Sequence, residues 1–162
     1  MATLIIYYSQ GGTTELVAKT LANELNASLV RIHDLKNREG FKNRLLSSVN
    51  AFRETKTEII PAKVDLSDFD IVYIGTPTWV GNPTPAIITI IDRCNFKGKD
   101  VVLFATMDSN RGETNIERLE EKIRMRGGRI IESFTIATKG KSSEKLVRDT
   151  EVIIETKDLK MY

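Results

Sequence analysis

The chain of 162 residues has little sulfur, little histidine and no excess of charge of one sign. With one cysteine, Cys94, an intrachain disulfide is excluded, and with one histidine, His33, so is a Cys/His metal cluster. The 24 basic and 22 acidic side chains give a formal net charge of +2, which is too balanced to indicate nucleic-acid binding. No apolar run is long enough to span a bilayer, and the apolar N-terminal run lacks the basic leader of a secretory signal. We therefore expect a cytoplasmic protein without membrane, metal or nucleic-acid contacts.

Catalytic side chains are also scarce. The sequence contains no zinc-ligand spacing, no triad pattern and no paired carboxylates at predicted loop ends, so we expect no catalytic residue of the protein itself. Cys94 follows an apolar stretch, which favours a packed thiol over a reactive one. His33 ends a predicted strand and is expected at the surface or at a sheet edge. The length suits one domain over residues 1–162 with a single core.

What the chain does have is a distinctive N-terminal segment. An apolar, β-branched and aromatic run over residues 4–8 predicts a buried strand, and apolar side chains at helical spacing follow from Leu16 onward. Between them lies a polar loop, formed by Ser9, Gln10, Gly11, Gly12, Thr13 and Thr14. Free N–H groups and the dipole at a helix start favour an anion, glycines allow close backbone approach, and hydroxyls add donors. No Gly-Lys-Ser/Thr sequence and no three-glycine fingerprint is present, which leaves a phosphomonoester cradle or an ordinary strand-to-helix turn.

A second loop follows another buried run over residues 71–74. It is rich in turn-forming residues and contains the only tryptophan; its candidate ligand-binding residues are Thr76, Pro77, Thr78, Trp79, Val80 and Gly81. A rigid loop that exposes a large flat aromatic suits stacking on a planar ligand, and the alternative is that Trp79 is a core anchor beneath the loop. In open α/β sheets the loops at the carboxyl ends of strands converge on one ligand site. We therefore expect these two loops to form one site.

With these two loops the chain resembles the flavodoxin family. The segment from Ser9 to Thr14 is similar to the family's FMN phosphate loop, and Thr76 to Trp79 resembles its first flavin-flanking loop. A third run falls where the family has its second flavin loop, and it supplies the candidates Thr106, Met107, Asp108, Arg111 and Gly112. The resemblance implies that FMN is the cofactor, that Thr76 and Thr78 lie near its ribityl chain, and that Trp79 lies against its ring. Because the third run contains no aromatic, the other ring face is expected to be open, or covered by Met107 or by a partner subunit.

The alternation of strand and helix patterns predicts parallel βαβ units. We expect an α/β fold, a three-layer, doubly wound, five-stranded parallel sheet of the flavodoxin-like order 2-1-3-4-5. The expected strands are residues 3–8, 28–32, 69–74, 100–106 and 129–138. The first two expected helices are residues 13–26 and an amphipathic helix with a basic face within 34–58. Pro83 or Pro85 is expected to open the third helix. The fourth is expected to start with a capping box over Thr114–Glu117 and to end at Gly127-Gly128, and the last to be capped by Ser142 or Ser143. Residues 157–162 are expected to fray.

Three functions are compatible with these features. The favoured one is a flavodoxin-type FMN electron carrier that serves redox partner proteins. The second is an FMN-dependent reductase that uses NAD(P)H and a quinone-type acceptor, which the absence of an acidic excess and of a second ring-covering aromatic would suit. The third is a flavin-free binding or regulatory domain, although Tyr8 and Ser9 stand where receiver domains carry acidic residues. Partner identity and the choice between monomer and homodimer stay open, and Arg111 is either a cation near the flavin or a solvent-exposed loop residue.

Overall fold

The computed structural model describes residues 2–36 and 56–162. Within these ranges no helix combines the length and apolar character needed to cross a membrane. Residues 37–55, which make up most of the segment in which the amphipathic helix with a basic face is predicted, lie outside the described residues.

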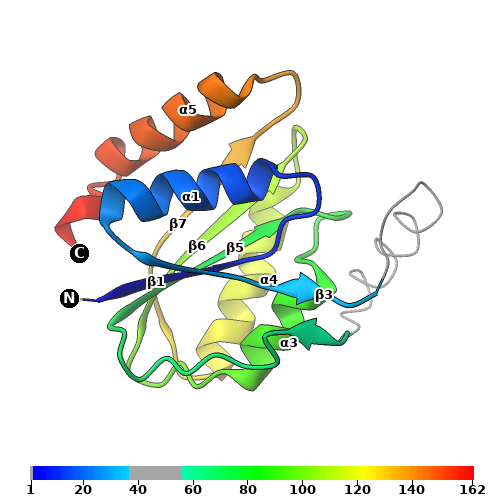
Figure 1. Cartoon of the computed structure of the whole chain (residues 1–162), viewed down its shortest axis with the longest axis vertical. Coiled ribbons are helices and arrows are strands. Elements are labelled where there is room, and N and C mark those ends of the chain that lie inside the picture. Colours follow the sequence, from blue (N-terminus) through cyan, green and yellow to red (C-terminus); the bar gives the residue numbers. More distant parts are fainter. Residues whose placement is uncertain (1, 37–55) are drawn as a thin grey trace.

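The centre of the fold is a parallel sheet of five strands. Its members are β1 (Thr3–Tyr7), β2 (Ser28–Arg31), β5 (Ile71–Pro77), β6 (Asp100–Met107) and β7 (Arg129–Ala137). They lie in the order β2-β1-β5-β6-β7, and every pairing is parallel (Figure 1). This is the predicted α/β fold with main-strand order 2-1-3-4-5. The interior strands β1, β5 and β6 are almost continuously buried, as expected for a sheet covered on both faces.

Strand register brings the loop-bearing ends together. Tyr7 at the end of β1 pairs with Gly75, and Pro77 at the end of β5 pairs with Thr106. The carboxyl ends of these three neighbouring strands therefore reach the same edge of the sheet. The polar loops that follow them must meet there, as in other open α/β sheets.

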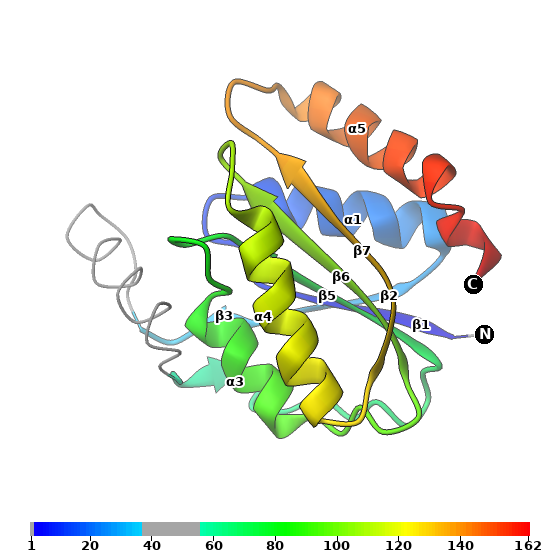
Figure 2. The same ribbon diagram turned by 180° about the vertical axis from the view of Figure 1, so that it is seen from behind.

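Helices cover both faces of the sheet (Figures 1 and 2). On one face lie α1 (Thr13–Leu25) and α5 (Ser143–Thr156), whose apolar side chains share a buried cluster with Tyr73 and Phe104. On the other lie α3 (Pro85–Arg93) and α4 (Gly112–Met125), which pack in a second cluster with Ile74 and Leu103. Pro85 occupies the first turn of α3, as one of the two predicted alternatives has it.

Two smaller elements differ from the sequence prediction. A two-stranded antiparallel sheet pairs β3 (His33–Asp34) with β4 (Ile59–Ile60), and strands this short leave no periodic signal. His33 is exposed on it, as expected of an edge residue. The C-terminal segment does not fray as predicted, because it forms a 3₁₀ helix, η1 (Leu159–Met161), that buries Leu159 in the α1/α5 cluster. In the sequence, Leu159 is the side chain that anchors this turn, and one apolar residue gives no periodic pattern.

Helix ends were predicted with mixed success. The proposed capping box over Thr114–Glu117 is wrong: α4 begins at Gly112, and its N-cap residue is Arg111, in the left-handed region at φ +69°. The cap at Ser142 is confirmed, since its hydroxyl accepts a hydrogen bond from the Lys145 N–H at 3.2 Å. Gly127-Gly128 ends α4 as predicted, with Gly128 N–H bonded to the Ile123 carbonyl. Cys94 is 1% exposed, and burial raises the pKa of its thiol, so it is the packed thiol expected.

Candidate functional site

A cavity of about 290 Å³ lies at the carboxyl edge of the sheet. It lies at the loops that follow β1, β5 and β6, and at the end of β7. Its lining consists of Gln10, Gly11, Thr13, Thr14, Pro77, Thr78, Trp79, Val80, Thr106, Met107, Asp108 and Thr138. This size stands at the lower end of the range usual for small-molecule sites. Among the described residues Asp108 is the only ionisable side chain in that lining, so an anion bound here would be held by N–H and O–H groups of these residues.

The loop between β1 and α1 leaves a hollow at the helix start. Gly12 is the N-cap residue of α1 with φ +96°, and its N–H donates to the Ser9 hydroxyl oxygen at 3.1 Å. The Gly12 carbonyl accepts the first helical hydrogen bond, from Leu16 N–H. Apart from its two chain neighbours, no atom of the described residues lies within 4 Å of a Cβ built on Gly11, so the space beside this residue is open to them. Free helix N–H groups at such a hollow can bind a phosphate.

Thr14 connects this loop to β6. Its hydroxyl lies 2.7 Å from the hydroxyl of Thr106, and the two residues are 1% and 2% exposed. Either oxygen can be the donor. Whichever donates, the hydrogen bond fixes the first turn of α1 relative to the end of the neighbouring strand and thereby fixes two walls of the cavity.

Arg31, at the end of β2, supports the same loop from behind. Its guanidinium donates to the Ser9 carbonyl at 3.0 Å and to the Glu15 carboxylate at 3.2 Å. Glu15 also pairs with Lys19, and chiefly this hydrogen bond lowers the pKa of the Glu15 carboxyl. An acidic side chain in the first helical turn is thus neutralised locally, which keeps its charge from opposing an anion at the helix start.

Trp79 opens a tight turn on the other side of the cavity. Its backbone makes two hydrogen bonds of 3.0 Å with Asn82, and the intervening Val80 and Gly81 have φ of +52° and +73°. Two positive φ values define a narrow hairpin turn, which a β-branched valine adopts only under strain. Trp79 lines the cavity, and its ring plane meets the Tyr8 ring at 90°, with centroids 5.9 Å apart. The turn therefore places Trp79 at the cavity wall, with its ring against Tyr8.

Thr76 and Thr78 have different roles although they are two residues apart. Thr76 is fully buried, and its hydroxyl donates to the Pro77 carbonyl and accepts from Thr84 N–H. It braces the loop from inside and is absent from the cavity lining. Thr78 does line the cavity, and its hydroxyl oxygen lies 2.9 Å from Nδ2 of Asn115, which comes from the first turn of α4. The difference follows from where β5 ends: Thr76 is still within the strand, whereas Thr78 lies just beyond its last residue, Pro77, in the loop.

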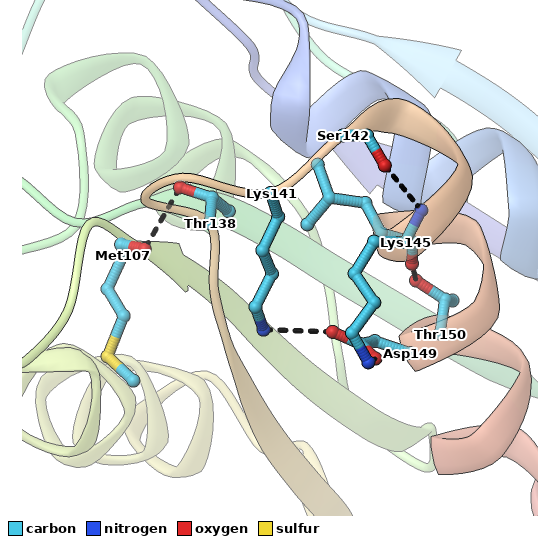
Figure 3. Close-up of polar contacts among 8 residues, drawn as sticks. Met107, Thr138, Lys141, Ser142, Lys145, Asp149 and Thr150 are labelled. Atoms are coloured by element: carbon cyan, nitrogen blue, oxygen red, sulfur yellow. Dashed lines mark hydrogen bonds and ion pairs between the residues drawn. The ribbon is translucent and has the colours of Figure 1, made fainter.

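The loops after β6 and β7 are joined beside the cavity. Met107 and Asp108 carbonyls accept hydrogen bonds from the N–H groups of Thr138 and Lys139, at 2.8 and 3.1 Å. The Thr138 hydroxyl also donates to the Met107 carbonyl at 3.1 Å, while the Met107 side chain extends toward α4 (Figure 3). A Cβ on Gly112 would lie 2.8 Å from both Met107 Sδ and Thr135 Cγ2 and 3.1 Å from Thr135 Cβ, so a larger residue would displace the side chains on this side of the loop.

The loop after β7 is also fixed to α5. Asp149 accepts from Lys141 at 2.8 Å and from Lys145 at 2.6 Å (Figure 3). These two hydrogen bonds lower the pKa of the Asp149 carboxyl. Hydrogen bonds to the loop after β6 on one side and to α5 on the other therefore hold the segment that places Thr138 at the cavity.

Most predicted site residues meet in the cavity, and several do not. Ser9 and Gly12 shape the loop between β1 and α1 without lining the cavity, Thr76 is buried behind it, and Gly112 packs against Met107. A second depression, of about 300 Å³, lies beside the first and is lined by Thr78, Val80, Gly81, Asp108, Asn110 and Arg111. Gly81 and Arg111 belong to this second depression and are absent from the lining of the first.

Three residues that shape the site were missed from the sequence: Arg31, Asn115 and Thr138. For Thr138 there was a signal, because it ends a predicted strand at the carboxyl edge of the sheet. Arg31 and Asn115 gave none, because their roles depend on which elements become neighbours in space.

The fold and the cavity define a doubly wound α/β protein with a ligand site at the carboxyl edge of its parallel sheet. The flavodoxin family model (Flavodoxin_4) matches residues 2–148, and the chain belongs to this family.

Individual relatives are distant. The flavodoxin of Nostoc sp. (strain PCC 7120) is 27% identical over 135 residues, which cover 78% of this chain and 66% of the relative, slightly under two thirds of its length. The flavodoxin of Synechococcus elongatus is 26% identical over 158 residues, which cover 92% of this chain and 79% of the relative.

Solved structures share the fold. A Lactobacillus acidophilus flavoprotein in complex with FMN superposes with a TM-score of 0.71 at 23% identity, over 83% of this chain and 92% of that chain. Two-electron-reduced Megasphaera elsdenii flavodoxin gives a TM-score of 0.54 at 15% identity, over 94% and 98%. At these identities the likeness concerns the fold.

Proposed function

We propose that the protein is an FMN-binding electron carrier of the flavodoxin type. The observation that carries this proposal is that the open helix start at Gly11 and the tryptophan at Trp79 line one cavity. A phosphomonoester that carries a flat ring needs these two features in one site. Membership of the flavodoxin family supports the same ligand, and a flavoprotein with this fold is described in complex with FMN.

The residues present fit FMN. The open space beside Gly11, the helix-start N–H groups and the hydroxyl of Thr13 suit the phosphate, and no acidic side chain lines that end of the cavity. Thr78, Trp79 and Met107 are placed for the remainder of the ligand. When bound, FMN accepts and returns one or two electrons, and the protein binds it, orients it and sets its potential.

The charge around the cavity bears on the reduction potential of a bound flavin. In the described part of the lining Asp108 is the one carboxylate, and Arg111 lies in the adjoining depression. An overall charge of +2 opposes accumulation of negative charge on the flavin less than an acidic protein would. We expect a less negative potential for the reduced flavin than an acidic rim would give, and redox partners that do not depend on an acidic docking surface.

The second candidate is an FMN-dependent reductase that takes electrons from NAD(P)H and passes them to a quinone-type acceptor. The depression of about 300 Å³ that shares Thr78, Val80 and Asp108 with the cavity favours it, because a second small molecule could bind there. Neither candidate fixes whether the protein acts as a monomer or a homodimer. The proposal includes a cytoplasmic location.

Two assays separate the candidates once FMN binding is established by absorbance and fluorescence titration. The first follows NAD(P)H oxidation with a quinone acceptor, and the second is an air-free reductive titration. Two resolved one-electron steps without pyridine-nucleotide turnover support the carrier. Rapid turnover without resolved one-electron steps supports the reductase. Failure of the purified protein to bind FMN at micromolar concentration would contradict both and favour a flavin-free binding domain.

A further inference from the structure

The side chain of Asn115 is buried between α4 and the loop that follows β5. The residue is 0% exposed, and its Nδ2 lies 2.9 Å from the Thr78 hydroxyl oxygen and 3.2 Å from the Pro77 carbonyl oxygen. A carbonyl oxygen only accepts hydrogen bonds, so the atom that faces Pro77 must be the amide nitrogen. Pro77 therefore fixes the orientation of the Asn115 amide without reference to any other contact.

This orientation determines what the Thr78 hydroxyl can do. An amide NH₂ group has two hydrogens and no lone pair to offer, so Thr78 Oγ1 must accept one of them. Thr78 then has its own hydroxyl hydrogen left to donate. Within the described residues this hydrogen has no acceptor, and Thr78 lines the cavity at this point.

We propose that Asn115 is a positioning residue that sets the Thr78 hydroxyl as a hydrogen-bond donor toward the cavity, so that the bound ligand must present an acceptor there. The proposal rests on the proposed function, because it takes FMN as the ligand. An isoalloxazine ring and a ribityl chain both carry acceptor oxygens, so the group fits this requirement. A ligand with a donor at that place would face two opposed hydrogens and bind weakly.

The burial of Asn115 supports a role beyond packing. Its Oδ1 atom is buried with no hydrogen-bond partner among residues 2–36 and 56–162. An unpaired buried amide oxygen is unfavourable, and a leucine of similar size would avoid it. The two hydrogen bonds that the Asn115 amide donates, to Pro77 and Thr78, offset this cost by organising the ligand-binding loop.

The test begins with FMN titrations of four proteins: wild type, Thr78→Val, Asn115→Ala and the double variant. Loss of one hydrogen bond to the ligand corresponds to about a fivefold weaker dissociation constant. We expect about this loss for Thr78→Val and near-wild-type binding for Thr78→Ser, which keeps the hydroxyl. Asn115→Ala should weaken binding severalfold when Thr78 is present and by clearly less in the Thr78→Val background.

A pH series on Asn115→Asp tests the polarity itself. A protonated aspartic acid can still donate to Thr78, whereas the ionised form can only accept and would turn the Thr78 hydrogen away from the ligand. FMN affinity should therefore fall with rising pH more steeply in Asn115→Asp than in Asn115→Asp/Thr78→Val. The second protein contains the same added charge and is the matched control for repulsion between it and the phosphate.

The outcomes are distinguishable. Equal weakening by Asn115→Ala in both backgrounds, or wild-type affinity of Thr78→Val, would overturn the proposal while leaving FMN as the ligand. Absence of FMN binding in wild type would overturn the proposed function instead. Urea unfolding of each ligand-free variant establishes that it is folded, and if the Asn115 variants do not fold, the comparison of Thr78→Val with Thr78→Ser decides whether the hydroxyl contributes at all.

Discussion

Gly11 and Gly12 are adjacent, yet substitution by alanine should affect the protein in opposite ways. Gly11 has no neighbour within 4 Å of an added Cβ, and its φ is not in the left-handed region. Gly11→Ala should therefore raise the free energy of unfolding of the ligand-free protein by about 0.4–1 kcal/mol, because it restricts the unfolded chain. Gly12 has φ +96°, where alanine is strained, so Gly12→Ala should lower it by about 1–2 kcal/mol.

For FMN binding we expect Gly11→Ala, which stabilises the ligand-free protein, to be harmful. The added methyl of Gly11→Ala would occupy the open space at the helix start, where we place the phosphate. Loss of one charge-assisted hydrogen bond there costs about 1.5–3 kcal/mol, or roughly a 10- to 150-fold weaker FMN dissociation constant. Urea unfolding gives the first quantity and flavin fluorescence titration the second. A Gly11→Ala protein that is stable and binds FMN as tightly as wild type would refute the phosphate assignment, because nothing else in the ligand-free loop responds to that methyl.

Four further results are expected. Thr14→Val should lower the free energy of unfolding by about 1–3 kcal/mol in urea titrations, because the buried Thr106 hydroxyl loses its partner, and adding Thr106→Val should recover part of that loss. Stoichiometric FMN should strongly quench the emission of Trp79, the only tryptophan, and unchanged emission with FMN bound would make this ring a core anchor. Gly81→Ala forces alanine to φ +73° and should shift the one-electron potentials more than the affinity for oxidised FMN; unaltered potentials in a redox titration would contradict this. Asp149→Asn should destabilise the protein at neutral pH but not in acid. Because the pKa of Asp149 is lowered in the folded state, its contribution to stability is present above the ordinary carboxyl pKa and is lost as the pH falls through the folded-state pKa. The urea midpoints of wild type and variant should therefore converge in acid.

The elements that could be predicted from the sequence are those in which one contiguous run carries the whole signal. The strands β1, β5 and β6 are buried on both faces, so their apolar runs stand out without knowledge of their neighbours. The loops after β1 and β5 follow directly from where those runs stop. Strand order came with the family resemblance, and the register then explains why loops some 60 residues apart in the chain share one cavity.

What could not be predicted depends on contacts between distant segments. Asn115 falls within a sequence that reads as a capping box, and only the packing of α4 against the loop after β5 gives it a different role. Arg31 reads as an ordinary strand end until β2 lies beside β1 and its side chain reaches Ser9. Leu159 gave no helical or strand period, yet it anchors the C-terminal turn. Local periodicity does not contain these facts.

Threonine hydroxyls account for much of how the separate loops become one site. Thr14 bonds across to Thr106, Thr76 bonds across to Thr84, and Thr78 accepts from Asn115. Each bond joins segments that belong to different elements or to opposite ends of a loop, and the residues involved are buried or half-buried. A hydroxyl can donate and accept at once, so one atom can hold a neighbour and still face the cavity. In the described part of the lining, which contains no cation, such hydroxyls can bind an anionic, hydrogen-bonding ligand. Loss of the hydroxyl of Thr14, Thr78 or Thr106, which line the cavity, should therefore affect the ligand and the loop together.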